Sequence, residues 1–383
     1  MKKILLMAGI ILLLSYPREL PSSEAIRQET PLKNNLPENV AGQPSKDWYI
    51  ERTAEIGLSQ KVPIIQVAYK TRDRKFFFET ANFDFVAASP DVSTVFQVAS
   101  VSKVVFSYIV LRLVDQGLLD LDRPLYEYTD GVVEERFRNA IPDDAEASVR
   151  NEEWAKRLTA RMVLTHGTGL PNWMQSSRPT NAKLVFTDEP DTRYTYSGEG
   201  FHYLQRVVEH ITAKSLNELA DEEVFIPLGM LSSSYKWRDE YASSHAYGYD
   251  TNNEKGEQGA DRPENSAYTL RTNVKDFSLF IEALMEGRGL KRETFEAMLT
   301  PQRLIEEPGL YFGLGIRVNP NEELGYGPLW HHSGSNTNFR AMFWLFPQEQ
   351  TYCIYFTNSA NGSGETRQKI YELFFPQYPE TTW

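Results

Sequence analysis

The segment that most constrains the fold is VASVSKVVFSYIVLRLVDQG, residues 98–117. Beyond its first turn it is apolar on nearly every side, so it predicts a helix that other elements surround. It opens with Ser100, Ser102 and Lys103. A serine there is ordinarily an N-cap, because its hydroxyl satisfies a free backbone N–H. Ser100 and Lys103, three residues apart, would also share one helical face, where the amine is able to take a proton from the hydroxyl.

Strand patterns occupy both ends of the chain, and helical patterns fill its middle. VPIIQVAYK and KFFFET, joined by TRDR, are typical of a hairpin, and so are FRAMFWLF and TYCIYFTN around PQEQ. YFGLGIRV is expected to be a further strand and ETRQKIYELFF a final helix. We therefore expect an α+β fold with an antiparallel sheet built from the N- and C-terminal segments and flanked by helices. A helical lobe over about residues 118–290 is inserted between them.

The N-terminus has the layout of an export signal. MKKILLMAGIILLL places two lysines before a short apolar run, which predicts a signal peptide or an uncleaved N-terminal anchor over residues 1–25. Residues 26–46 are polar with three prolines and predict a linker, whereas residues 47–383 predict one folded domain. We expect an exported bacterial protein, periplasmic or secreted, tethered to the membrane if the signal stays uncleaved. The lone cysteine, Cys353, cannot form an internal disulfide and is expected to be buried.

Composition excludes several classes of function. The formal net charge is −12 and no stripe of lysine and arginine occurs, which argues against a nucleic-acid partner. His331 and His332 are adjacent, but neither a second cluster with ligand spacing nor an HExxH motif accompanies them. We therefore expect no metal and no other cofactor. The expected partner is a small-molecule or peptide substrate, and the oligomeric state stays open.

Two further motifs follow the apolar helix. RYTYSGEGF contains Tyr196-Ser197-Gly198, and GPLWHHSGSNTNF contains His332-Ser333-Gly334. Together with S-x-x-K at Ser100, they resemble the motifs of the class C β-lactamase and D-alanyl-D-alanine carboxypeptidase family of serine hydrolases, which is related to penicillin-binding proteins. LTHGTGLP at 164–171 and FIPLGM at 225–230 resemble further stretches of that family. The resemblance implies a β-lactamase/transpeptidase-like fold.

The resemblance also implies an acyl-enzyme mechanism. Ser100 attacks as the nucleophile, and Lys103 and Tyr196 shuttle its proton, with either of them as the base. A lysine base needs its pKa lowered from about 10.4 towards neutrality, by burial or by nearby positive charge. His332 stands where many relatives have lysine, and its ring would hydrogen-bond the Tyr196 oxygen or the substrate.

Backbone groups and small residues complete the implied site. The N–H groups of Ser100 and Ser335 are expected to form an oxyanion hole at the start of the helix. Ser333, Gly334 and Gly198 are expected to border the substrate.

Three more residues near the motifs receive supporting roles. His166, within LTHGTGLP, is expected to hold a loop through its ring nitrogens. Trp173 and Trp330 are candidates for lining the pocket. The many other aromatic residues are most simply core.

The sequence departs from the family pattern at two places. Relatives that hydrolyse β-lactams usually have Asn at the third place of Y-x-N, whereas this chain has Gly198, which cannot hydrogen-bond a substrate amide. His332 likewise removes a fixed positive charge that would attract a substrate carboxylate. Both changes favour an esterase or a D-amino-acid peptidase-like hydrolase, with a β-lactamase as the alternative. A second alternative is a sensor module that binds cell-wall peptides without turnover.

Overall fold

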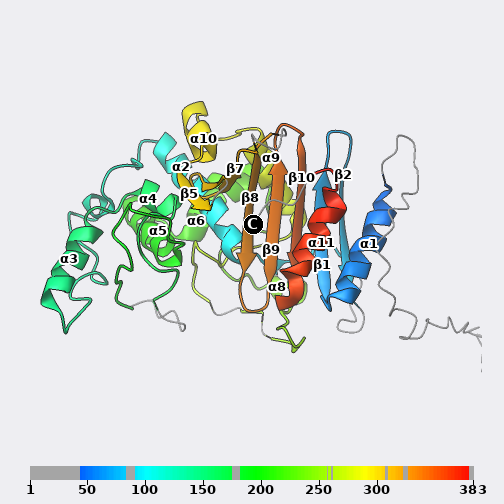
Figure 1. Ribbon diagram of the computed structural model, residues 1–383, viewed down its shortest axis with the longest axis horizontal. Coiled ribbons are helices and arrows are strands. Elements are labelled where there is room, and N and C mark those ends of the chain that lie inside the picture. The colour runs from blue at the N-terminus through cyan, green and yellow to red at the C-terminus, as the bar shows by residue number, and fades with distance from the viewer. Residues whose placement is uncertain are drawn as a thin grey trace, which may run out of the picture. The chain divides into compact units, whose positions relative to one another are not determined.

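One antiparallel sheet joins the two ends of the folded chain (Figure 1). The computed structural model describes residues 44–82, 91–174, 182–256, 258–259, 262–306, 309–321 and 327–378. Within these ranges eight strands run in the order β2-β1-β10-β9-β8-β7-β6-β5. The N-terminal hairpin enters this sheet through β1, which lies antiparallel to β10 with Ile65 opposite Thr357. The predicted α+β fold, with a sheet built from both chain ends, is confirmed.

The long strands, β2, β1, β10, β9 and β8, form one side of the sheet, and the short strands, β7, β6 and β5, form the other. Their bounds are β1 (Ile64–Lys70), β2 (Lys75–Ala81), β5 (Arg303–Glu306), β6 (Leu310–Phe312), β7 (Arg317–Asn319), β8 (Leu329–Ser335), β9 (Arg340–Phe346) and β10 (Thr351–Thr357). A second, two-stranded sheet pairs β3 (Phe96–Gln97) with β4 (Arg271–Thr272). The prediction of one strand over YFGLGIRV is wrong, because the chain turns at Gly313, whose N–H donates to Ile316 O at 2.9 Å. That segment forms the antiparallel pair β6 and β7 instead.

Helices come mainly from the middle of the chain. The α-helices are α1 (Lys46–Ser59), α2 (Ser102–Asp115), α3 (Ala145–Ala155), α4 (Ala160–Leu164), α5 (Gly198–Thr212), α6 (Leu216–Ala220), α7 (Ile226–Leu228), α8 (Tyr241–Ser244), α9 (Val274–Met285), α10 (Arg292–Leu299) and α11 (Glu365–Phe374). Residues 118–290 therefore hold α3 to α9. Their assignment as a separate lobe stays a prediction.

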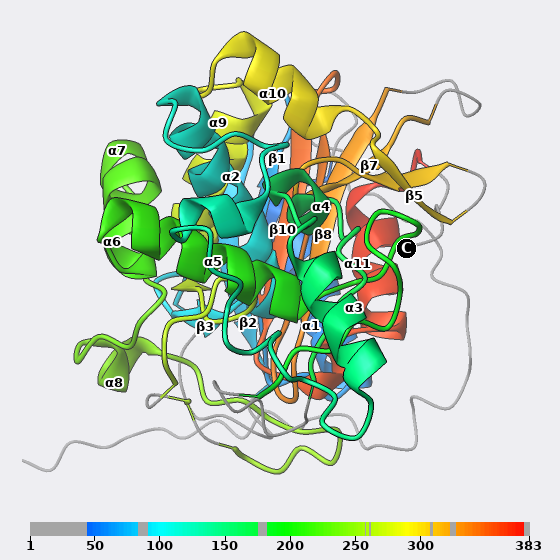
Figure 2. The ribbon, with the colours of Figure 1, turned by 90° about the vertical axis from the view of Figure 1, so that its left-hand side faces the viewer.

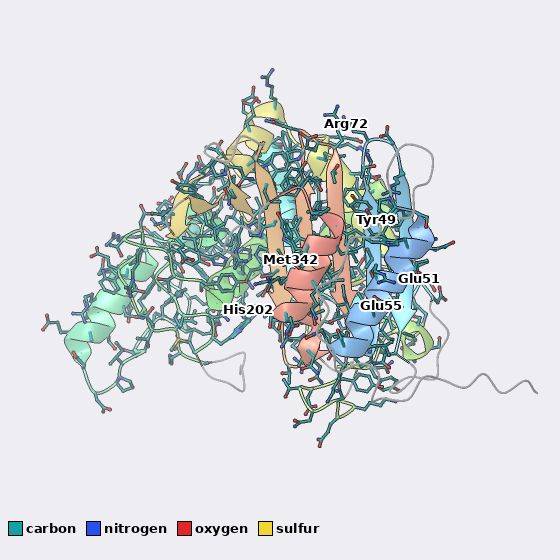
Figure 3. All side chains as sticks on the ribbon, turned by 45° about the vertical axis from the view of Figure 1, so that its right-hand side comes forward. Tyr49, Glu51, Glu55, Arg72, His202 and Met342 are labelled. Atoms are coloured by element: carbon teal, nitrogen blue, oxygen red, sulfur yellow. The ribbon has the colours of Figure 1, made fainter. Side chains whose placement is uncertain are left out.

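Helices cover both faces of the sheet. On one face α1 and α11 pack together, and the rings of Tyr49 and Phe374 stack with their centres 4.9 Å apart. Figure 3 shows Tyr49 and Met342 on this face. On the other face, α2 lies between the sheet and α5, where Phe106 meets Phe201 with ring centres 6.1 Å apart (Figure 2). The apolar side chains of α2 thus meet neighbours on all sides.

Helix α2 is the buried helix that its sequence predicts. Its first ten residues, from Ser102 onward, are all buried. The Ser102 hydroxyl accepts the Leu270 N–H at 3.0 Å, which fixes the start of the helix to the segment before β4. Ser100 is not an N-cap: it lies in a 3-10 turn, Ala99–Val101, and the described residues provide no side-chain cap for this turn or for α2. Its hydroxyl is therefore available for other contacts.

Some predictions fall on residues 1–43, which lie outside the described residues. The signal peptide or anchor over 1–25 and nearly all of the linker over 26–46 therefore stay predictions. Across the described ranges, no helix combines the length and apolar character needed to cross a membrane. The same ranges contain no group of three or more histidine, cysteine, aspartate or glutamate side chains arranged to hold a metal ion. Cys353 is buried in β10.

Candidate active site

The amine of Lys103 reaches the hydroxyl of Ser100. Lys103 Nζ lies 3.3 Å from Ser100 Oγ and donates to the carbonyl oxygen of Ala267 at 2.9 Å. The lysine is 1% exposed, whereas Ser100 is half-buried. The 3-10 turn continues directly into α2, which keeps the two side chains on one face. The serine hydroxyl therefore has an amine beside it that is almost wholly shielded from water.

Tyr196 brings a phenol to the same hydroxyl. Its side chain shares a hydrogen bond with Ser100. Lys103 Nζ lies 4.9 Å from the centre of the tyrosine ring. Burial raises the pKa of Tyr196, and the Ser100 hydrogen bond and the positive charge of Arg317 oppose that rise. The structure thus brings together the alcohol, the amine and the phenol singled out in the sequence.

A buried histidine holds the loop that carries Tyr196. His166 Nδ1 accepts the Ser197 N–H at 3.0 Å, and its ring centre lies 4.2 Å from that of Tyr196. Ser197 in turn caps α5 by accepting the Gly200 N–H at 2.8 Å. Burial above all, and then the positive charge of Lys103, holds the pKa of His166 well below its ordinary value. His166 is therefore a neutral ring that positions Tyr196.

His332 is a neutral histidine whose second ring nitrogen is an acceptor. Its Nδ1 lies 2.8 Å from the Ser333 carbonyl oxygen, which can only accept, so Nδ1 carries the proton. Its Nε2 is buried without a hydrogen-bond partner among the described residues. Burial first, and then the charges of Arg317 and Lys103, lower the pKa of His332 well below its ordinary value. At the place of the family's lysine, this chain thus offers a lone pair instead of a charge.

Strand β8 passes directly against the backbone of Ser100. A Cβ atom at Gly334 would lie 2.1 Å from the Val98 carbonyl oxygen and 3.2 Å from the Ser100 nitrogen. Only glycine allows the two backbones to approach this closely. The next residue, Ser335, is exposed. The end of β8 therefore borders the backbone of Ser100, whose N–H is one of the two expected oxyanion-hole donors.

Arg317 of β7 adds a positive charge that the motifs do not reveal. Its Nη1 donates to Ser333 Oγ at 3.1 Å, and its guanidinium carbon lies 5.8 Å from the centre of the Phe312 ring. Its charge lowers the pKa of both Tyr196 and His332. The sequence signal is a single arginine in YFGLGIRV, which becomes informative only when β7 is known to pair with β8.

Replacing Arg317 by glutamine is expected to move the pH profile of catalysis to higher pH. Loss of the positive charge raises the pKa of Tyr196, because the phenolate loses a stabilising charge, and that of His332, because the imidazolium loses a repelling one. The limb of the pH profile of kcat/KM that reports the ionisation of either group is then expected to shift to higher pH by about 0.5 to 1 unit.

Ester hydrolysis between pH 5 and 10 measures this shift. Arg72→Gln is the matched control, because Arg72 lies exposed at the turn between β1 and β2 (Figure 3). It should leave the profile in place. A profile that is equally unmoved in Arg317→Gln contradicts an electrostatic role for Arg317.

Known families and structures share this architecture. The family model described as Beta-lactamase matches residues 77–374. The chain belongs to the beta-lactamase family. A solved class C β-lactamase superposes with a TM-score of 0.70 and 18% sequence identity, over 87% of this chain and 98% of that chain. At that identity the likeness shows the fold, and the expected β-lactamase/transpeptidase-like fold is confirmed.

Two curated relatives match a shorter stretch of the chain. A lovastatin esterase of Penicillium rubens is 28% identical over 160 residues, which cover 37% of this chain and 39% of that protein. Penicillin-binding protein 4 of Amycolatopsis lactamdurans is 30% identical over 159 residues, which cover 39% of this chain and 37% of that protein. Each match thus covers less than half of the relative's own length.

Proposed function

We propose that this chain is a serine hydrolase that forms an acyl-enzyme on Ser100 and cleaves an ester or amide bond. The observation that carries the proposal is the contact of two proton-transfer groups with one hydroxyl. Lys103 Nζ lies 3.3 Å from Ser100 Oγ, and Tyr196 hydrogen-bonds the same side chain. A serine hydroxyl becomes a nucleophile only when a neighbouring base removes its proton.

The reaction divides into acylation and deacylation. In acylation the Ser100 oxygen attacks the carbonyl carbon, and its proton passes to the Lys103 amine or to a Tyr196 phenolate. The bond to the leaving group then breaks, and the leaving group takes that proton. In deacylation a water molecule attacks the acyl carbon and gives its proton to the same pair of groups, which return it to the departing Ser100 oxygen. Because both groups contact Ser100, the choice of base stays open.

The negative charge that develops on the carbonyl oxygen is assigned to two backbone donors. These are the N–H groups of Ser100 and Ser335. The support is the close approach of β8 to Ser100, with the Cβ position of Gly334 only 3.2 Å from the Ser100 nitrogen. Donors fixed in advance are effective because they need no reorganisation when the charge appears.

The proposed substrate is an ester or a D-amino-acid amide in preference to a β-lactam. His332 provides a neutral acceptor where a lysine would provide a charge for a substrate carboxylate. Gly198 provides no side-chain amide for the substrate. The name of the esterase relative supports the same preference. β-Lactam hydrolysis remains the alternative outcome.

A hydrolysis panel tests the proposal. Wild type is expected to hydrolyse 4-nitrophenyl butyrate at least tenfold faster, by kcat/KM, than the cephalosporin nitrocefin, with a D-alanyl-D-alanine peptide as the third substrate. Ser100→Ala is expected to lose about a thousandfold in kcat/KM. Ser107→Ala is the matched control, because its hydroxyl lies on the same helix and donates to the Lys103 carbonyl oxygen at 2.7 Å.

The outcomes separate the candidate functions. Full activity in Ser100→Ala contradicts the acyl-enzyme. Nitrocefin as the best substrate supports a β-lactamase. Tight binding of the peptide with no turnover of any substrate supports a sensor module and contradicts the hydrolase.

The chain is also proposed to be exported to the periplasm or the medium. The support is the sequence of residues 1–25, with Lys2 and Lys3 before an apolar run. Cell fractionation of the full chain and of a chain lacking residues 1–25 tests this. Retention of the full chain in the cytoplasm contradicts export.

A further inference from the structure

Gly198 is a glycine because Trp173 occupies the space of its side chain. A Cβ atom at Gly198 would lie 2.6 Å from Trp173 Cζ2 and 2.8 Å from the Asn172 carbonyl oxygen. Real Cβ atoms essentially never show contacts below 3.0 Å. Any side chain at Gly198, including an asparagine, would have to displace the indole. In this chain, the Trp173 indole thus occupies the space that an asparagine side chain at the third place of Y-x-N would need.

The indole is held between two fixed neighbours. Asn172, directly before it, accepts the Gly198 N–H on its side-chain oxygen at 3.0 Å and the Glu199 N–H on its carbonyl oxygen at 3.1 Å. Directly after it, the Met174 N–H donates to Glu199 Oε1 at 3.2 Å. The backbone on both sides of Trp173 is thus fastened to the first turn of α5.

The same indole contacts the residue that follows a hydrogen-bond partner of Lys103. Its ring meets that of Tyr268 edge to face, with ring centres 5.5 Å apart. Tyr268 follows Ala267, whose carbonyl oxygen accepts from Lys103. Trp173 and Tyr268, here named the aromatic pair, therefore link Gly198 at the start of α5 to the turn that contains Ala267. Both residues are half-buried, so part of each lies at the surface of the protein.

We propose that the aromatic pair is the wall against which the acyl group of the substrate packs, and that it selects hydrocarbon acyl groups over acyl groups that carry an amide. This inference rests on the proposed acyl-enzyme function and names its substrate class. An indole and a phenol ring bury hydrocarbon favourably. A substrate amide packed on their faces loses hydrogen bonds to water that the apolar ring faces do not replace.

A series of 4-nitrophenyl esters tests the inference. For wild type, kcat/KM is expected to rise about two- to fourfold with each added CH₂ from acetate to hexanoate. The pentanoate is expected to exceed the N-acetylglycine ester, which has an amide in place of two CH₂ groups, by at least tenfold. Trp173→Ala is expected to flatten the chain-length series and to shrink this ratio to about threefold or less. Trp154→Ala, a tryptophan packed on Phe186, is the matched control and should change neither.

A double variant tests the replacement itself. Gly198→Asn alone is expected to destabilise the fold, because the new side chain meets the indole. Adding Trp173→Ala removes the clash with the indole and leaves that with the Asn172 carbonyl oxygen, so it is expected to restore part of the lost melting temperature and to raise the relative rate of the N-acetylglycine ester. Where Trp173→Ala does not fold, Trp173→Gln keeps bulk at the position and is expected to flatten the series in the same way.

The results distinguish this inference from the function on which it rests. A chain-length series that is as steep in Trp173→Ala or Trp173→Gln as in wild type overturns the inference, while loss of turnover in Ser100→Ala leaves the hydrolase standing. Turnover that survives in Ser100→Ala overturns the proposed function instead.

Discussion

Lys103→Met is expected to lower kcat/KM for ester hydrolysis by about a thousandfold. The variant keeps a long unbranched side chain at a position that is 1% exposed, and it removes the amine that lies 3.3 Å from Ser100 Oγ. Without that nitrogen, the proton of Ser100 loses one of its two acceptors. Pre-steady-state release of 4-nitrophenol measures the acylation rate separately from deacylation, and the loss is expected in both steps.

Two variants make this result interpretable. Lys275→Met changes an exposed lysine in the first turn of α9 and should keep wild-type rates. Tyr196→Phe removes only the phenol oxygen. Comparing its loss of kcat/KM with that of Lys103→Met shows which of the two groups is the base. A folded Lys103→Met protein that retains more than a tenth of wild-type kcat/KM contradicts a role for the amine in proton transfer.

Stability is expected to fall steeply as the pH drops below about 6.5. Five histidines, His166, His202, His245, His331 and His332, have a lowered pKa in the folded chain, mainly because burial disfavours the charged ring. The pKa is lowered to about 4 for His202 and for His245. The unfolded chain therefore binds protons below about pH 6.5 that the folded chain does not, and each such histidine costs about 1.4 kcal/mol per pH unit.

Buried carboxyl groups act in the opposite sense. Burial raises the pKa of Glu79 to about 7, so its contribution to stability grows as the pH falls through that value. Glu199, Glu264, Asp221 and Asp276 are also raised and offset part of the histidine effect. The net loss between pH 7 and pH 5 is expected to be on the order of 5 kcal/mol, comparable to the whole stability of many domains.

Urea unfolding at a series of pH values measures this loss. His245→Gln removes one of the five titrating groups. It should reduce the slope of the unfolding free energy against pH by the equivalent of about one bound proton. His210→Gln is the matched control, because the His210 side chain is 51% exposed. A free energy of unfolding that stays flat from pH 7 to pH 5 contradicts neutral buried histidines.

The long strands of the two hairpins could be predicted because their patterns are long and local. β1 with β2, and β9 with β10, are hairpins of seven-residue strands rich in aromatic and branched residues, joined by short turns. β6 and β7 could not be predicted, because strands of three residues carry no clear pattern and their pairing is set by contacts elsewhere in the chain. The turn at Gly313 was therefore hidden inside an apparently continuous strand.

The candidate site likewise has parts that local sequence patterns predict and parts that they do not. Ser100 and Lys103 could be paired from sequence because helical spacing alone fixes their relation. The proximity of Tyr196 came from a family resemblance, and its contact with Ser100 needed the structure. The fit of Trp173 against Gly198 was not predictable, because it joins residues 25 positions apart through a distance that no local pattern encodes.

Labelling with a fluorophosphonate probe tests most directly whether Ser100, Lys103 and Tyr196 form an acylation centre. Mass analysis of the digested protein is expected to find the probe on the peptide that contains Ser100 in wild type. The adduct should be absent in Ser100→Ala and formed far more slowly in Lys103→Met. An unmodified Ser100 in folded protein that still hydrolyses esters, or a probe attached to another residue, would contradict the account.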